Sequence, residues 1–367
     1  MAQDATPKIR VTFVLPSFAG GGAERVVLTL ARNLSREKFQ PGLVVLDGRG
    51  PLKNLVSEDV PVTDLNRPRL RHAWRPLAAA LRERNSDVVV STISHINLAV
   101  LMLRRRLGPA TRIVARESNT PSASLASTRW PGLFRWLYRR YIPRADAILC
   151  PSQRVAAEFA GDFGIAPGKF SVMPHPVDVE TVRRVAAKPQ RTPGAGLRFV
   201  GAGRMTRQKG LDRLVDLLPA LPEDTHLTLL GDGDQLDALR QRAVKCEVEN
   251  RISFPGFTEN PWGHFAGADA FLLPSRWEGM PNAVLEALAV GTPVIARSEA
   301  GGIGEIAATD GAVTIVDSNE AFAKAMRRTR PRSVEAPAAS LLPERFSLDA
   351  VMAEFEDLLV SVVGGKS

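Results

Sequence analysis

The sequence predicts an α/β protein made of two doubly wound domains, each with a parallel sheet covered by helices on both faces. Short runs rich in Val, Ile, Leu and Phe alternate with amphipathic helical stretches, which is the element order of a parallel sheet. The alternation restarts after residues 187–196, a stretch rich in Pro, Gly and basic residues that we interpret as a linker or surface loop.

The first half of the chain is predicted to form one domain, residues 1–178. An apolar run at 9–15 leads into a glycine loop at 20–22 and then into a helix with an apolar face. Further strands are expected at 42–46, 88–93, 112–115, 147–150 and 170–173, with helices at 75–84 and 97–107.

The second half is predicted to form a similar domain, residues 196–345. Its expected strands are 197–201, 227–230, 252–254, 270–273, 293–296 and 312–315. Its expected helices are 211–218, 236–244, 283–289 and 319–328. The last segment, 346–367, contains an amphipathic helix at 348–363, which either packs on this domain or crosses back to the first.

Composition narrows the class of protein. Hydrophobic residues make up 44% and charged residues 24% of the 367 positions, as in soluble globular enzymes. Two cysteines, Cys150 and Cys246, provide no disulfide framework and fit a reducing cytoplasm. No secretory leader is evident, and no apolar run approaches the ~20 residues that span a bilayer.

The net charge of +9 leaves nucleic acid, anionic small molecules or an anionic membrane surface as partners. No nucleic-acid-binding motif accompanies the charge, so we expect no nucleic acid partner. One basic cluster is Arg104, Arg105 and Arg106. Another, at 129–144, alternates basic and aromatic residues: Arg129, Arg135, Arg139, Arg140 and Arg144 with Trp130, Phe134, Trp136, Leu137, Tyr138 and Tyr141. It is either a membrane-interfacial helix or a helix with an aromatic core face and a solvated arginine face.

A pair of glutamates, Glu278 and Glu286, is the most informative motif. Glu278 lies in a Gly/Pro-rich turn after an expected strand, and Glu286 lies two helical turns further on. Backbone N–H groups of Gly279, Met280 and Asn282 at this helix N-terminus suit an anion, and the carboxylates suit hydroxyl groups. A nucleotide sugar combines both features, although such pairs also occur on solvated helix faces.

Two glycine loops follow strands and precede helices. The loop at 19–25 is either an anion-binding turn or a tight turn that needs positive φ. The loop at 200–210 carries Arg204 and Lys209, which suit a diphosphate leaving group if the loop folds back. The alternative for this loop is a basic surface loop.

In combination these motifs resemble glycosyltransferase family four over nearly the whole chain. The resemblance rests on Arg204 with Lys209, on the two glutamates, on glycine-containing stretches at 291–296 and 301–306, and on 21–24. It implies the GT-B fold, with two facing domains, the first on the acceptor side and the second binding the nucleotide sugar. It also implies a retaining transfer by front-face attack, without a metal or other cofactor.

The resemblance assigns roles by position. Arg204 and Lys209 would hold the diphosphate, Glu278 would face the donor sugar, and Glu286 would bind the ribose hydroxyls; Arg204, Lys209 and Glu278 are the expected catalytic residues. The donor-binding set it implies is Gly21, Gly22, Gly203, Gly279, Met280, Pro281, Asn282, Leu285 and Glu286.

One departure from the family pattern follows the strand at 112–115. Many members carry a histidine there, whereas this chain has Arg116-Glu117-Ser118-Asn119 and resembles a subgroup with Glu in its place. Glu117 is a candidate contact to acceptor or donor sugar. His95, at the end of the preceding strand, is another candidate or else a structural histidine.

We therefore expect a hexosyltransferase that uses a nucleotide sugar, with UDP favoured, and a lipid-linked or polysaccharide-precursor acceptor. Its expected location is cytoplasmic, peripheral at the inner face of the cytoplasmic membrane. The alternatives are transfer to a soluble acceptor, a GT-B epimerase, or a nucleotide-sugar-binding protein without turnover.

Overall fold

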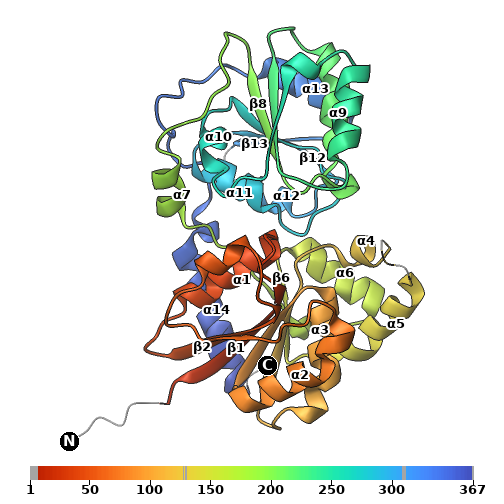
Figure 1. Cartoon of the computed structure of the whole chain (residues 1–367), viewed down its shortest axis with the longest axis vertical. Coiled ribbons are helices and arrows are strands. Elements are labelled where there is room, and N and C mark those ends of the chain that lie inside the picture. Colours follow the sequence, from red (N-terminus) through yellow and green to blue (C-terminus); the bar gives the residue numbers. More distant parts are fainter. Residues whose placement is uncertain (1–6, 127, 129, 308–310, 366–367) are drawn as a thin grey trace, which may run out of the picture. The chain divides into compact units, whose positions relative to one another are not determined.

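The structure is a computed structural model that describes residues 7–126, 128, 130–307 and 311–365. The chain divides into two compact units (Figure 1). The N-terminal unit contains the chain up to Pro176 and the segment from Asp349 onward, and the C-terminal unit is Val177–Leu348.

The N-terminal unit is built on a seven-stranded parallel sheet in the order β3-β2-β1-β4-β5-β6-β7. Its strands are β1 (Ile9–Ser17), β2 (Phe39–Asp47), β3 (Val62–Asp64), β4 (Val88–Thr92), β5 (Arg112–Arg116), β6 (Ala147–Cys150) and β7 (Phe170–Val172). The strand order reverses between β1 and β4, which is the switch point of a doubly wound sheet.

Helices cover both faces of this sheet because neighbouring strand residues point to opposite sides. The helices are α1 (Gly22–Asn33), α2 (Leu70–Arg84), α3 (Ser94–Leu103), α4 (Pro121–Ala126), α5 (Pro131–Tyr141), α6 (Gln153–Phe163) and α14 (Leu348–Val363). Val14 joins the core formed with α2, α3, α5 and α6. Its neighbour Phe13 instead packs on Phe355 of α14, with ring centroids 6.1 Å apart.

The C-terminal helix α14 therefore belongs to the N-terminal unit. Besides the ring contact, Glu356 Oε1 accepts a hydrogen bond of 2.8 Å from the backbone N–H of Ser35. Of the two positions open from the sequence, the structure has the return to the first unit.

The C-terminal unit contains a six-stranded parallel sheet in the order β10-β9-β8-β11-β12-β13. The strands are β8 (Arg198–Ala202), β9 (His226–Leu230), β10 (Ile252–Gly256), β11 (Ala270–Leu273), β12 (Val294–Arg297) and β13 (Val313–Val316). The helices are α7 (Val179–Val185), α8 (Leu211–Leu217), α9 (Leu236–Lys245), α10 (Trp262–Ala266), α11 (Asn282–Ala289), α12 (Ile303–Ile306) and α13 (Asn319–Arg328).

Two hydrophobic layers sandwich this second sheet. Val200, Phe271 and Val294 join the layer of α7, α10, α11 and α12. The adjacent residues Phe199, Leu272 and Ile295 join the layer of α8, α9 and α13. Strands buried on both faces explain why the sequence shows continuous apolar runs instead of alternation.

The predicted fold class, two doubly wound parallel-sheet domains, is confirmed. The sequence missed β3, a three-residue edge strand without an apolar run, and the helices α4, α6, α7, α10 and α12. Among the described residues, no helix combines the length and apolar character that crossing a membrane requires.

Candidate functional site

In an open parallel sheet, ligands bind at the carboxyl ends of the strands, and in the C-terminal unit the loops at this edge carry the predicted donor-binding residues. The loops after β8 and β9 are tied together by backbone hydrogen bonds. Met205 N donates to Asp232 O at 2.8 Å, and Gly203 N donates to Leu230 O at 3.0 Å. Gly231 has a φ of +127°, and a Cβ on it would lie 2.0 Å from Gly203 O. The backbones of the two loops are therefore held against each other at this edge of the sheet.

Lys209 and Glu278 form the central charged pair on this edge. The Lys209 ammonium lies 2.7 Å from Glu278 Oε1, and Ser275 Oγ donates to the same oxygen at 2.7 Å. Glu278 is only 5% exposed, whereas the Lys209 side chain keeps 20% of its surface in solvent. The pair thus combines a buried, oriented carboxylate with a cation that remains open to a ligand.

Two glycines make this pair possible. Gly203 has a φ of +149°, and a Cβ there would lie 2.9 Å from Lys209 Cε, so the missing side chain leaves room for the lysine stem. Gly301 has a φ of +65°, and its Cβ would lie 1.8 Å from the Glu278 carbonyl oxygen. The glycine loop after β12 therefore packs directly on the backbone of Glu278.

Further arginines brace the same loops. Arg213, in α8, donates to Pro274 O at 3.1 Å and to Glu299 at 2.6 Å. Arg276 forms two hydrogen bonds with Asp212, of 2.8 and 2.7 Å, and this pairing lowers the pKa of that carboxyl group. Arg213 and Arg276 are thus paired with Glu299 and Asp212, as Lys209 is with Glu278.

The other sequence-derived donor residues lie in different environments. Arg204 is exposed, on the loop that also carries Gly203. Gly279 and Pro281 are buried in the turn before α11, and Gly279 O accepts from Gly302 N at 3.2 Å. Asn282 starts α11, and Glu286 lies half-buried in its second turn.

Two members of that set are core residues. Leu285 is completely buried and Met280 is 4% exposed, and both pack in the hydrophobic layer of α11. Their side chains shape the helix, so any direct donor contact from them has to come from the backbone.

In the N-terminal unit, Gly21 is the N-cap of α1 and Gly22 is its first residue. A Cβ on Gly21 would lie 2.0 Å from Glu24 Oε2, so the missing side chain makes room for that carboxylate. Any residue can adopt the φ of −77° at this position. Glycine is therefore required here by the close approach of the Glu24 side chain and not by the backbone conformation.

Glu117 is the centre of a buried polar network at the carboxyl end of β5. Its Oε1 accepts from Asn97 Nδ2 at 2.7 Å and from the Tyr138 hydroxyl at 3.1 Å, and Ser94 Oγ lies 3.5 Å from Oε2. Burial raises the pKa of Glu117 to about 7, because these neighbours are neutral and only partly replace water. Glu117 is therefore a proton-binding group near neutral pH.

Arg116, the neighbour of Glu117, is also buried. Its guanidinium bonds His175 Nε2 at 2.7 Å and Thr92 Oγ1 at 3.1 Å, and burial lowers its pKa to about 10. His95, the other candidate, is exposed in the first turn of α3. The preceding residue Ile93 has a φ of +59°, an unusual conformation for a β-branched residue and a mark of local strain at this edge.

Comparison with known proteins decides the family. Residues 20–181 match the family described as Glycosyltransferase Family 4, and residues 184–329 match Glycosyl transferases group 1. The lipopolysaccharide core biosynthesis mannosyltransferase LpsB of Rhizobium meliloti is 30% identical over 293 residues, which cover 71% of this chain and 77% of that protein.

This chain belongs to the group 1/family 4 glycosyltransferases.

The glycosyltransferase is also similar to a further curated relative and to a solved structure. The N-acetylgalactosamine-N,N'-diacetylbacillosaminyl-diphospho-undecaprenol 4-alpha-N-acetylgalactosaminyltransferase of Campylobacter jejuni is 25% identical over 85% of this chain and 87% of its own. The structure of Anabaena HepE in complex with UDP and glucose has a TM-score of 0.77 at 18% identity, covering 96% of this chain and all of that one. The glycosyltransferase has the GT-B fold.

Several residues of the glycosyltransferase's two polar centres were not found from its sequence. Ser275 stands three residues before Glu278, and this spacing could have been noticed in the turn. Asn97, Tyr138 and His175 are far from Glu117 and Arg116 in sequence, so only the folded chain brings them together. In the described part of the chain, no three His, Cys, Asp or Glu side chains gather as a metal site would require.

Proposed function

We propose that this glycosyltransferase moves a hexosyl group from a UDP-sugar to a lipid-linked or polysaccharide-precursor acceptor, with retention of the anomeric configuration. The observation that carries the proposal is the Lys209–Glu278–Ser275 centre on the glycine-lined edge of the C-terminal unit. The HepE complex with UDP and glucose supports the choice of donor.

The residues divide the donor between them. Lys209 and Arg204 stabilise the negative charge that grows on the diphosphate as it leaves, a role that a metal ion plays in other enzymes. Glu278, fixed by Ser275, accepts hydrogen bonds from hydroxyls of the donor sugar, and Glu286 accepts them from the ribose.

The reaction breaks the bond between the anomeric carbon and the β-phosphate oxygen. The acceptor hydroxyl forms the new C–O bond on the same face of the sugar, and its proton passes to the departing phosphate oxygen. The carboxylates of Glu278 and Glu286 therefore position the donor and need not exchange a proton.

The donor is tested by thermal denaturation with UDP, GDP and ADP and their sugars. A ligand that binds only the folded protein at 100 times its Kd stabilises it by about 2.7 kcal/mol, and we expect the largest shift with a UDP-sugar. NMR spectroscopy of the product then gives the anomeric configuration. Inversion, epimerised donor without transfer, or binding without turnover would each contradict the proposal.

The acceptor is proposed to be membrane-bound because α5 exposes a mixed apolar and basic face. Trp130, Leu133 and Trp136 keep 61%, 53% and 57% of their surface in solvent, whereas Tyr138 on the opposite face is buried. The helix thus has both a core face and an outward aromatic face, and Arg140 lies on the exposed surface. Arg129 lies outside the described residues. An aromatic and basic surface of this kind suits the inner face of the cytoplasmic membrane.

Liposome flotation tests this interface. We expect wild type to float with anionic vesicles and Leu133→Ser with Trp136→Ser to lose flotation, because both residues are exposed and the core is untouched. Replacing Arg135, Arg139 and Arg140 by Ala should also weaken flotation. Unchanged flotation of these variants, together with full transfer to a water-soluble acceptor, would favour the soluble-acceptor alternative.

A further inference from the structure

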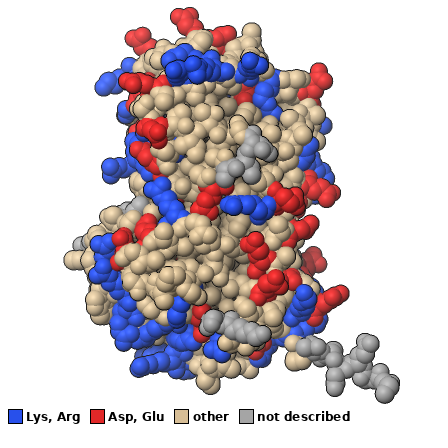
Figure 2. Space-filling model, turned by 180° about the vertical axis from the view of Figure 1, so that it is seen from behind, with Lys and Arg blue, Asp and Glu red and all other residues tan. Residues whose placement is uncertain are grey.

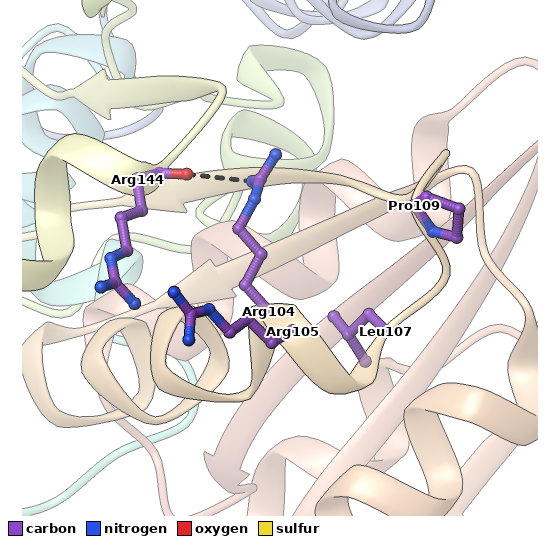
Figure 3. A pocket seen from close by; sticks show the side chains of 5 residues that line it. All are labelled: Arg104, Arg105, Leu107, Pro109 and Arg144. Carbon is purple, nitrogen blue, oxygen red and sulfur yellow. Dashed lines mark hydrogen bonds between the residues drawn. The ribbon is translucent and has the colours of Figure 1, made fainter.

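A second basic cluster in the N-terminal unit takes no part in the proposed transfer. Arg104 and Arg105, in the 3-10 turn Arg104–Arg106 after α3, and Arg144, in the turn Ile142–Arg144, line an open pocket of about 700 Å³. Leu107 and Pro109 complete its wall (Figure 3). Over the lower left of the N-terminal unit in Figure 2, Lys and Arg side chains gather, while acidic side chains gather on the other side.

This pocket lies at the opposite edge of the sheet from the Glu117 network. The turn with Arg105 leads toward the amino end of β5, and Arg144 comes shortly before the amino end of β6. Glu117 follows the carboxyl end of β5. Because five strand residues span roughly 16 Å, the pocket is separate from the edge where substrates bind in this kind of sheet.

The three arginines differ in how their charge is balanced. Arg104 is neutralised by Asp146, with contacts of 2.5 and 2.9 Å, and also donates to Arg144 O at 2.9 Å. Asp146 lies 3.6 Å from Arg112 as well. In the described part of the chain, no carboxylate forms an ion pair with Arg105 or Arg144.

The guanidinium groups of Arg105 and Arg144 are directed toward the same space, whereas the Arg104 guanidinium points to the Arg144 carbonyl (Figure 3). Like charges brought together repel each other, and an anion between them removes this repulsion. The Arg144 guanidinium is held over the Tyr141 ring, 4.7 Å from its centroid. Because this contact already restricts the Arg144 side chain, less conformational entropy is lost when the side chain binds an anion.

We propose that this pocket binds a phosphate ester, with the phosphate between Arg105 and Arg144 and the organic part against Leu107 and Pro109. Guanidinium groups match phosphate oxygens in bidentate geometry, and the pocket is much larger than a phosphate alone. The ester is either a lipid phosphate at a membrane surface or a soluble phosphate ester. The inference does not depend on the identity of the sugar donor or acceptor.

The test compares Arg105→Gln with Arg144→Gln, made together, with a control that removes the same charge elsewhere. Lys324 and Arg328 are exposed on α13, so Lys324→Gln with Arg328→Gln is a matched control. The probes are phosphatidylcholine vesicles containing phosphatidic acid, measured by co-sedimentation, and glycerol 3-phosphate, measured by ³¹P NMR. The two probes share one head group, and only the first is a lipid.

We expect the pocket variant to lose about tenfold or more in affinity, because it loses charge-assisted hydrogen bonds to the phosphate, while the control stays near wild type. Binding of vesicles alone assigns the pocket to a lipid phosphate, and binding of both probes assigns it to a phosphate ester in general. Retained glycerol 3-phosphate binding in Lys209→Gln separates the pocket from the donor site. Binding of neither probe by wild type, or equal losses in the pocket variant and the control, would overturn the inference.

Discussion

Each unit has a buried carboxylate at the carboxyl edge of its parallel sheet. The two carboxylates differ in the charge of the groups to which they are hydrogen-bonded. In the C-terminal unit, Glu278 meets the ammonium of Lys209 at 2.7 Å. In the N-terminal unit, the side-chain hydrogen-bond partners of Glu117 among the described residues are the neutral groups of Asn97, Tyr138 and Ser94, and the guanidinium of Arg116 bonds His175 instead.

This difference teaches how one fold can hold two carboxylates for different tasks. A carboxylate paired with a cation orients that cation, and the partly exposed cation is available to a ligand phosphate. A carboxylate among neutral donors changes its protonation near pH 7, as the raised pKa of Glu117 indicates. The first arrangement suits ligand binding, and the second makes the unit respond to pH.

The largest effect is expected from removing the cation of the charged centre. Lys209→Gln should lower kcat by about 10²–10³, because the leaving diphosphate loses a positioned positive charge. Arg207→Gln is the control, since Arg207 is an exposed cation of the same loop. Steady-state kinetics with the preferred nucleotide sugar measure the effect. A loss below tenfold, or an equal loss in the control, would show that Lys209 is only one of many surface charges.

The network of neutral groups around Glu117 should make the stability of the protein depend on pH. The pKa of Glu117 is about 7 in the folded protein, against an ordinary 4.5 in the unfolded chain. The contribution of Glu117 to the free energy of unfolding is therefore fully present below pH 4.5 and is lost as pH rises through 7. The loss is up to about 3 kcal/mol. Glu117→Gln keeps an acceptor for Asn97 and Tyr138 and should remove this loss. The stability of the variant relative to wild type should therefore be higher at pH 8 than at pH 5.

Urea unfolding of wild type and variant at pH 5 and pH 8 provides the measurement. Glu58→Gln, at an exposed position of the same unit, should leave the pH dependence as it is in wild type. If Glu117→Gln and wild type change in parallel between the two pH values, Glu117 is ionised throughout and the contrast between the two units fails.

A smaller effect tests the glycine support of Glu278. Gly301→Ala places a Cβ against the Glu278 carbonyl oxygen at a φ of +65°, which should cost about 1–3 kcal/mol of stability and reduce donor binding. Gly304→Ala is the matched control in α12, because nothing lies within 4 Å of its Cβ. Thermal denaturation and donor titration should separate the two variants, and similar behaviour would contradict the proposed packing.

The smallest expected effect concerns the second glutamate. Glu286→Gln should raise KM for the donor about tenfold, equal to 1.4 kcal/mol, with kcat changed little, because the residue is assigned to ribose binding. Glu320→Gln, exposed on α13, serves as the control. If turnover is abolished while donor binding is intact, Glu286 takes part in the chemical step.

Sequence reasoning was strongest for short, fully buried apolar strands and for a clearly amphipathic helix. The strands 147–150 and 270–273 and the helix 319–328 were predicted with the bounds that the structure has. It was weak for α6, whose Ser152 N-cap and Gly164 C-cap are signals that could have been used. The edge strand β3 has no local signal, since pairing with β2 defines it.

The candidate site was predictable only in part, for a physical reason. Glycines and charged residues near strand ends can be recognised from sequence, so Lys209 and Glu278 could be predicted as site residues, but their direct contact could not. The network of Glu117 joins β5, α3 and α5, and such pairings depend on tertiary packing. The burial that raises the pKa of Glu117 is likewise a property of the folded unit.

The return of α14 to the first sheet has a consequence for synthesis on the ribosome. The C-terminal unit is one continuous stretch, whereas the N-terminal unit needs Phe355 to cover Phe13. While the chain emerges, the part of the first sheet around Phe13 therefore stays without its α14 contact until the last helix is made. The unit that begins first is completed last, and a message truncated after residue 348 would encode the whole C-terminal unit but an N-terminal unit without the helix that covers Phe13.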